Sequence, residues 1–127
     1  MKIFVVEDSA AVRERLIEMI REVEDAEVVG EAETCDTAVA GIIDARPDVA
    51  ILDIRLADDT GSGIDVLNRV RRQLPSVKAI ILSNYTSPQH IKAGADAGAD
   101  YVLDKSEDFE RIVEILRRMR DDASESN

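Results

Sequence analysis

Five short apolar runs rich in β-branched residues alternate with stretches of helical spacing, and this alternation restricts the fold more than any other feature. The runs predict strands over residues 2–6, 26–32, 49–52, 78–82 and 101–103. Apolar residues spaced three or four apart predict helices within 12–23, 38–43, 64–70, 86–98 and 109–119. Each strand is followed by a helix, so we expect an α/β fold that repeats the βα unit five times.

Strands that alternate with helices pair in parallel, and right-handed crossovers place helices on both faces of the sheet. The runs are almost continuously hydrophobic, which is typical of strands covered on both faces. We therefore predict a doubly wound, five-stranded parallel sheet. Helix starts are indicated by Ser9 before the first helix, Pro88 in the fourth, and Ser106 with the acidic residues after it before the last.

The length of 127 residues suits a single domain, which we expect over residues 1–120, with 121–127 as a flexible tail or the start of a linker. A net charge of -11 repels polyanions, and the arginines at 116–120 suit a helix C-terminus, so we expect no direct binding of nucleic acid by this domain. The single cysteine, Cys35, has no partner for a disulfide or a CxxC site. Without a signal peptide or a run of transmembrane length, we expect a cytoplasmic protein with no membrane association.

Polar and charged side chains follow four of the five predicted strands. Glu7 and Asp8 follow the first strand, Asp53 the third, Ser83 the fourth and Lys105 the fifth. The carboxyl ends of parallel strands meet at one edge of the sheet, where open α/β sheets bind their ligands. One carboxylate after a strand is usually a helix cap. Three carboxylates, a hydroxyl and an amine at four strand ends indicate a functional site.

The chemistry of that site follows from its charge. Two carboxylates at about 4 Å repel each other by about 4 kcal/mol at an effective dielectric constant of about 20, so the cluster needs a cation. Oxygen ligands without histidine or cysteine favour Mg²⁺. With Mg²⁺ and Lys105 in place the site is near neutral and can accept a phosphoryl group on Asp53, since aspartyl phosphates are an established form of covalent catalysis.

Four short motifs and their spacing resemble one family. Ser83 lies 30 residues after Asp53, and Lys105 lies 52 residues after it. The motifs are "VVED" at 5–8, "AILD" at 50–53, "IILS" at 80–83 and "DK" at 104–105. Over residues 1 to about 120 the chain resembles the receiver domain of two-component response regulators, including the stand-alone chemotaxis type.

The resemblance implies a flavodoxin-like fold with strand order 2-1-3-4-5. It implies that Asp53 accepts a phosphoryl group from a histidine kinase or a histidine phosphotransfer domain, and that Ser83 and Lys105 contact that group. The implied Mg²⁺ ligands are Glu7, Asp8, Asp53 and the main-chain carbonyl of Arg55.

The same resemblance implies a phosphorelay signalling protein and not a classical enzyme. Phosphorylation would alter the surface made by the fourth helix, fifth strand and fifth helix, and so control binding to a downstream protein target. Whether phosphorylation also drives dimer formation is left open by the sequence.

The chain departs from the family pattern at several places. Val102 stands where the family has an aromatic switch residue, and Tyr101, one residue earlier, should face the other side of the sheet. Ser106 replaces the proline after the lysine, so we expect no cis peptide there. The loop at 57–63 is about two residues longer than the family loop and adds acidic residues beside the site.

Two other functions compete with phosphorelay signalling for this pattern of residues. A phosphohydrolase of the haloacid-dehalogenase type needs its nucleophile on the first strand and a second aspartate two residues later, where this chain has Arg55. A receiver-like module that binds partners without phosphorylation is the stronger alternative, because the switch positions are altered.

Overall fold

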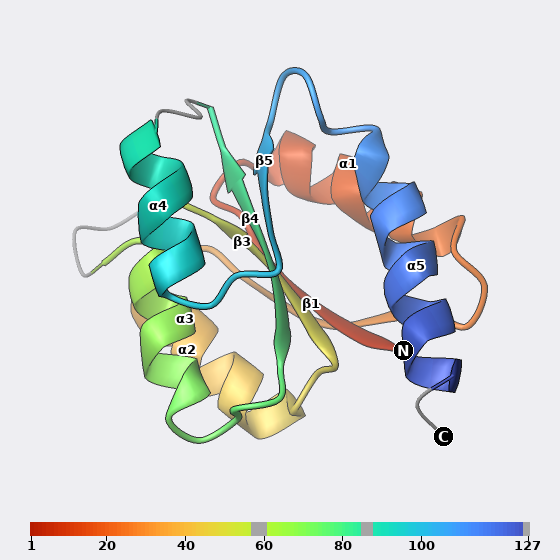
Figure 1. The fold of residues 1–127 in the computed structure, drawn as a ribbon, viewed down its shortest axis with the longest axis horizontal. Coiled ribbons are helices and arrows are strands. Elements are labelled where there is room, and N and C mark those ends of the chain that lie inside the picture. The colour runs from red at the N-terminus through yellow and green to blue at the C-terminus, as the bar shows by residue number, and fades with distance from the viewer. Residues whose placement is uncertain (57–60, 85–87, 126–127) are drawn as a thin grey trace.

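Strands and helices alternate strictly along the chain in the computed structural model (Figure 1). The structure describes residues 1–56, 61–84 and 88–125, apart from the side chains of 90, 124 and 125. Every predicted strand is confirmed to within one residue at each end. The elements are β1 (Lys2–Val6), α1 (Ala10–Arg21), β2 (Glu27–Ala32), α2 (Cys35–Ala45), β3 (Val49–Asp53), α3 (Gly63–Arg71), β4 (Lys78–Ser83), α4 (Pro88–Asp96), β5 (Tyr101–Asp104) and α5 (Arg111–Glu125).

The sheet is parallel throughout and has the order β2-β1-β3-β4-β5, which confirms the predicted flavodoxin-like topology. Helices α1 and α5 cover one face, and α2, α3 and α4 cover the other (Figure 1). The carboxyl ends of all five strands therefore lie at the same edge of the sheet.

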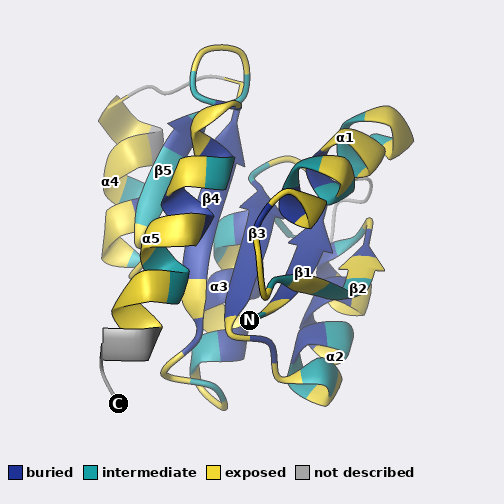
Figure 2. Cartoon of the chain, turned by 90° about the vertical axis from the view of Figure 1, so that its right-hand side faces the viewer, coloured by how far each residue is buried: buried dark blue, intermediate teal, exposed yellow. Residues whose placement is uncertain are grey.

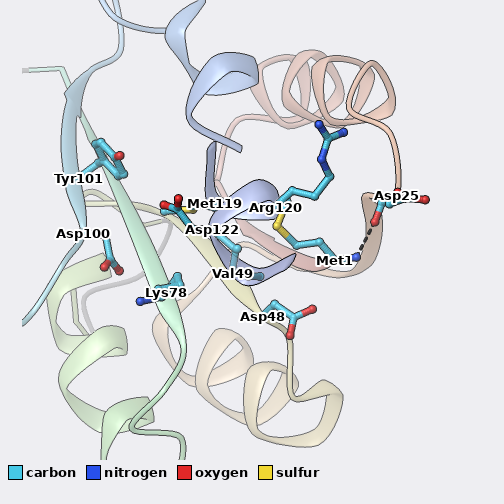
Figure 3. Close-up of a pocket in the computed structure, with 11 residues that line it drawn as sticks. Met1, Asp25, Asp48, Val49, Lys78, Asp100, Tyr101, Met119, Arg120 and Asp122 are labelled. Carbon is cyan, nitrogen blue, oxygen red and sulfur yellow. Dashed lines mark hydrogen bonds between the residues drawn. The ribbon is translucent and has the colours of Figure 1, made fainter. Parts of the chain in front are cut away.

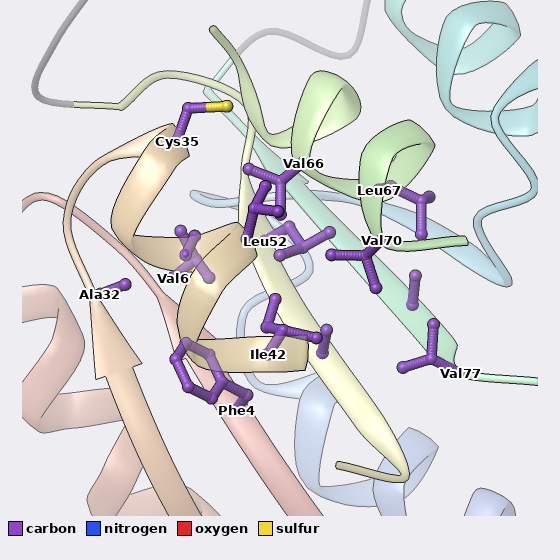
Figure 4. Close-up of a cluster of buried hydrophobic side chains, with 14 of the residues drawn as sticks. Phe4, Val6, Ala32, Cys35, Ile42, Leu52, Val66, Leu67, Val70 and Val77 are labelled. Atoms are coloured by element: carbon purple, nitrogen blue, oxygen red, sulfur yellow. The ribbon is translucent and has the colours of Figure 1, made fainter. Parts of the chain in front are cut away.

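Side chains alternate between two hydrophobic cores, one on each face of the sheet. On β1 and β3 the even-numbered residues, such as Phe4 and Leu52, pack against Ile42 of α2 and Val66 and Val70 of α3 (Figure 4). The odd-numbered residues of the same strands pack against α1 and α5. Both faces of the central strands are consequently buried (Figure 2), which explains why their sequences are hydrophobic without interruption.

The first helix begins as predicted. The Ser9 hydroxyl accepts a hydrogen bond from the Val12 N–H at 3.4 Å, so Ser9 is the N-cap of α1. Helix α4 begins at Pro88, which also agrees with the prediction. A proline is tolerated at the first helical position because the N–H that it lacks would have no intrahelical partner there.

The predicted start of the last helix at Ser106 is wrong, because α5 begins at Arg111. Asp104 Oδ1 accepts hydrogen bonds from the N–H groups of Ser106 at 2.7 Å and Glu107 at 3.1 Å. Asp108 Oδ2 accepts one from the Asp104 N–H at 3.0 Å. These side chains hold the backbone in turns, since they compete with helical hydrogen bonds.

The peptide between Lys105 and Ser106 is not cis, in agreement with the sequence prediction. Helix α5 continues to Glu125, and the domain boundary at 120 stays a prediction. Of the long loop expected at 57–63, residues 57–60 lie outside the described part of the chain. Within that part, the helices are too short or too polar to cross a lipid bilayer.

Candidate functional site

Three carboxylates converge at the carboxyl edge of the sheet. One oxygen from each of Glu7, Asp8 and Asp53 lies within 4.8 Å of the other two. Glu7 and Asp53 are buried, with 0% and 3% of their surface exposed, while Asp8 is exposed. The predicted acidic cluster therefore forms, and it is open to solvent on the Asp8 side.

The strand period explains why these side chains meet. Asp53 continues the odd-numbered row of β3 that faces α1 and α5, and Glu7 follows directly on the corresponding row of β1. Lys105 comes two residues after Leu103, which points to the same face from β5. Since residues two apart on a strand share a face, all three side chains gather on one side of the sheet edge.

Lys105 binds both buried carboxylates. Its Nζ donates hydrogen bonds to Asp53 Oδ2 at 2.7 Å and to Glu7 Oε1 at 3.1 Å. Glu7 Oε2 lies 2.8 Å from the same nitrogen, but outside hydrogen-bond geometry, and it is buried with no hydrogen-bond donor among the described residues. One lysine thus compensates one of three negative charges and leaves a buried oxygen available to a cation.

The pKa values of Glu7 and Lys105 reflect this imbalance of charge. Burial, supported by the nearby charge of Asp53, raises the pKa of Glu7 to about 7, against the opposing effect of Lys105. Burial alone would lower the pKa of Lys105, but the hydrogen bonds and charges of Asp53 and Glu7 raise it instead. Lys105 is therefore protonated, and the cluster has an excess of negative charge.

A cavity of about 410 Å³ opens over the acidic cluster. The Arg55 N–H donates to Asp53 Oδ1 at 3.3 Å, so both oxygens of Asp53 have a donor. On the other wall the Arg15 guanidinium lies over the Phe109 ring, 4.6 Å from its centroid, so another cation lines the cavity there. The cavity is large enough to admit a small anionic group to Asp53.

Not every predicted site residue faces this cavity. Arg55 lines it, in keeping with the prediction, but its role as a carbonyl ligand stays a prediction. Ser83 is buried at the end of β4, next to Leu82, whose register partner on β3 is Asp53. The neighbouring Asn84 lines the cavity and Ser83 does not. The proposed contact of Ser83 with a phosphoryl group is thus untested.

The two residues at the altered switch positions point in opposite directions, as expected from the strand period. Tyr101 packs in the core under α1 and α5, and Val102 packs in the core on the other face. A Cβ on Gly94 of α4 would stand 2.6 Å from Val102 Cγ2. Helix α4 therefore lies directly on Val102, at a glycine that has no side chain to separate the two.

A larger cavity, of about 570 Å³, lies at the opposite edge of the sheet (Figure 3). The amino group of Met1 donates there to the main-chain carbonyl of Asp25. Two of its carboxylates accept hydrogen bonds from the backbone. Asp48 accepts one from the Lys2 N–H at 2.7 Å, and Asp100 accepts one from the Ala79 N–H at 2.8 Å. These acidic groups serve the fold, so the functional site is the smaller cavity at the carboxyl edge.

Two residues that matter to the site escaped the sequence reasoning. Gly63, the first residue of α3, lies so close to Asp53 that a Cβ would stand 2.1 Å from the Asp53 carbonyl oxygen. Arg13 of α1 donates to the Glu7 carbonyl at 2.7 Å. A glycine at a helix start and an arginine one turn into a helix are common, so neither carries a sequence signal of its own.

Comparison with known proteins gives a consistent result. The family model of the response regulator receiver domain matches residues 3–117. The DNA-binding transcriptional activator DevR/DosR of Mycobacterium tuberculosis is 38% identical over 104 residues, which cover 81% of this chain and 47% of that protein. The chain spans about half the length of the curated relatives it matches.

Solved structures match the fold over almost its whole length. The response regulator domain of Thermotoga maritima CheB has a TM-score of 0.81 and 26% identity, covering 95% of this chain and 94% of that one. The chemotaxis protein CheY4 of Vibrio cholerae has a TM-score of 0.80 and 27% identity, covering 93% and 97%. The similarity thus includes both a domain of a larger regulator and a chemotaxis protein.

Proposed function

The chain belongs to the response regulator receiver domain family, and from that premise we propose that Asp53 is its phosphoacceptor. The chain is accordingly a signalling domain of a two-component system and not a classical enzyme. The observation that carries the proposal is the buried Asp53 carboxylate, held by Lys105 at 2.7 Å on the floor of a cavity with Glu7 and Asp8.

The transfer we propose forms one bond and breaks one. An Asp53 oxygen attacks the phosphorus of a phosphohistidine, the O–P bond forms, the N–P bond breaks, and the imidazole nitrogen leaves and takes up a proton. Lys105 would then pair with a phosphoryl oxygen, and the Ser83 hydroxyl would donate to another. These residues position and neutralise the group, which is the main requirement of phosphoryl transfer.

The residues of the cluster fit a magnesium ion. Their oxygens are close enough to share one cation, and the buried Glu7 Oε2 lacks a hydrogen-bond donor among the described residues. We propose Glu7, Asp8, Asp53 and the Arg55 carbonyl as the groups that hold Mg²⁺. When bound, Mg²⁺ would neutralise charge on the phosphoryl oxygens.

Incubation with acetyl phosphate and Mg²⁺ tests the phosphoacceptor directly. We expect intact mass spectrometry to show the gain of one phosphoryl group, and Asp53→Asn to show none, because its amide oxygen is a poor nucleophile. Asp44→Asn, an exposed change of equal charge on α2, should be modified like the parent. No mass gain in the parent would favour the module that binds partners without phosphorylation.

Magnesium should also stabilise the unphosphorylated protein. A ligand present at 100 times its dissociation constant adds about 2.7 kcal/mol to the free energy of unfolding. We expect the melting temperature to rise with Mg²⁺ concentration, and to rise much less in Asp8→Asn, which keeps the buried Lys105 pairs intact. An equal rise with NaCl at the same ionic strength would contradict a specific Mg²⁺ site.

Receiver domains interact with histidine kinases and with downstream effectors. For this chain we propose a histidine kinase or phosphotransfer domain as the donor, and a protein target that reads the α4-β5-α5 surface. The packing of α4 on Val102 at Gly94 favours a switch through movement of α4, since no aromatic side chain stands at position 102. A cytoplasmic location is consistent with this role.

A further inference from the structure

We propose that Arg13 is a positioning residue, which fixes the peptide between Glu7 and Asp8 so that both carboxylates are aimed at a divalent cation. The inference rests on the function proposed above and adds a residue that neither contacts the phosphoacceptor nor belongs to the acidic cluster. It is carried by the hydrogen bonds of one guanidinium group.

That guanidinium joins three segments of the chain. Its Nη1 donates to the Glu7 carbonyl at 2.7 Å, its Nε donates to Glu31 Oε1 at 3.1 Å, and its Nη2 lies 3.0 Å from Glu33 Oε1. Only 16% of the Arg13 side chain is exposed. Arg13 therefore ties the turn after β1 to the end of β2 and the turn that follows it.

The Glu7 backbone is held on both sides as a result. Its N–H donates to the Ala32 carbonyl at 3.0 Å, which extends the pairing of β1 with β2. Its carbonyl accepts from Arg13, and the plane of the next peptide is set by that carbonyl. Asp8 is the next residue and lies on the exposed side of the site, so the direction in which its side chain leaves the backbone depends on this peptide.

The two glutamates make the role of Arg13 geometric more than electrostatic. Glu31 and Glu33 neutralise the guanidinium and orient its planar fork, in the way that outer partners orient the ligands of a metal. Lysine at this position would keep the charge, but it lacks the planar fork that holds the Glu7 carbonyl and both glutamates at once.

Calorimetric titration of the unphosphorylated protein with Mg²⁺ tests this assignment. Arg13→Met keeps an apolar stem and removes the donors, and we expect it to weaken Mg²⁺ binding by about 10-fold or more, as loss of such outer partners commonly does. Arg13→Lys should lie between Arg13→Met and the parent. Arg118→Ala, at an exposed ion pair on α5, is the control, since it too removes one positive charge from a chain of net charge -11.

The sign of the effect separates positioning from charge. Removing a cation near the site should by charge alone tighten the binding of Mg²⁺, so weaker binding in Arg13→Met supports positioning. Binding as tight as that of the parent, or tighter, would overturn it. Absence of Mg²⁺ binding by the parent itself would instead overturn the proposed metal site, and this inference with it. Should Arg13→Met fail to fold, Arg13→Lys decides: weaker binding supports the role, and unchanged binding overturns it.

Discussion

Replacement of Lys105 by methionine is expected to lower the free energy of unfolding by about 3–5 kcal/mol in metal-free buffer. Glu7 and Asp53 would lose Lys105, the cation that binds both of them, at side chains that are 0% and 4% exposed. Removing one partner of a buried ion pair is costly because the remaining charge is neither hydrated nor compensated. For a chain of this size, the loss corresponds to a fall in melting temperature of roughly 10–20 °C.

Thermal and urea unfolding in the presence of a chelator measure this effect. Lys92→Met, an exposed change on α4, is the matched control and should leave stability nearly unchanged. Added Mg²⁺ should restore part of the loss in Lys105→Met, since a cation in the cluster would again compensate the two carboxylates. A similar stability of the Lys105→Met and Lys92→Met variants would contradict the buried ion pair.

Gly63→Ala is expected to destabilise the fold by about 3 kcal/mol or more and to slow phosphorylation of Asp53. Helix propensity alone predicts the opposite sign, because alanine is favoured over glycine in helices by about 1 kcal/mol. The added Cβ would stand 2.1 Å from the Asp53 carbonyl oxygen, and the Gly63 N–H is bonded to the Ile54 carbonyl at 3.0 Å. The obstacle is backbone, so α3 must move or the end of β3 must distort, at or above the usual cost of overpacking.

Urea unfolding and the rate of mass gain with acetyl phosphate test both parts of this prediction. Ser62→Ala is the neighbouring control, because Ser62 caps the same helix by accepting from the Asp65 N–H at 3.3 Å. Its loss should cost about 1 kcal/mol and leave phosphorylation intact. Gly63→Ala with parental stability would show that α3 and the end of β3 pack less closely than the structure indicates.

Much of the fold could be predicted because its signals are local. The runs of β1, β3 and β4 are clear signals, since a strand buried on both faces must be hydrophobic at nearly every position. The start of α5 was missed because Asp104 and Asp108 bind the intervening backbone with their side chains. The identity of these residues suggests a helix start as readily as a turn, and only their three-dimensional contacts distinguish the two.

The candidate site, too, has features that the sequence predicts and features that appear only in the structure. By itself the sequence determined that carboxylates and an amine follow strands which must end at one edge of a parallel sheet, because strand direction and side-chain period are encoded locally. The tertiary structure alone decided that Lys105 bridges Glu7 and Asp53, that α3 touches the Asp53 backbone at Gly63, and that Arg13 holds the turn before Asp8. Those contacts join segments far apart in the chain, and their distances depend on how the helices pack against the sheet, which no local pattern records.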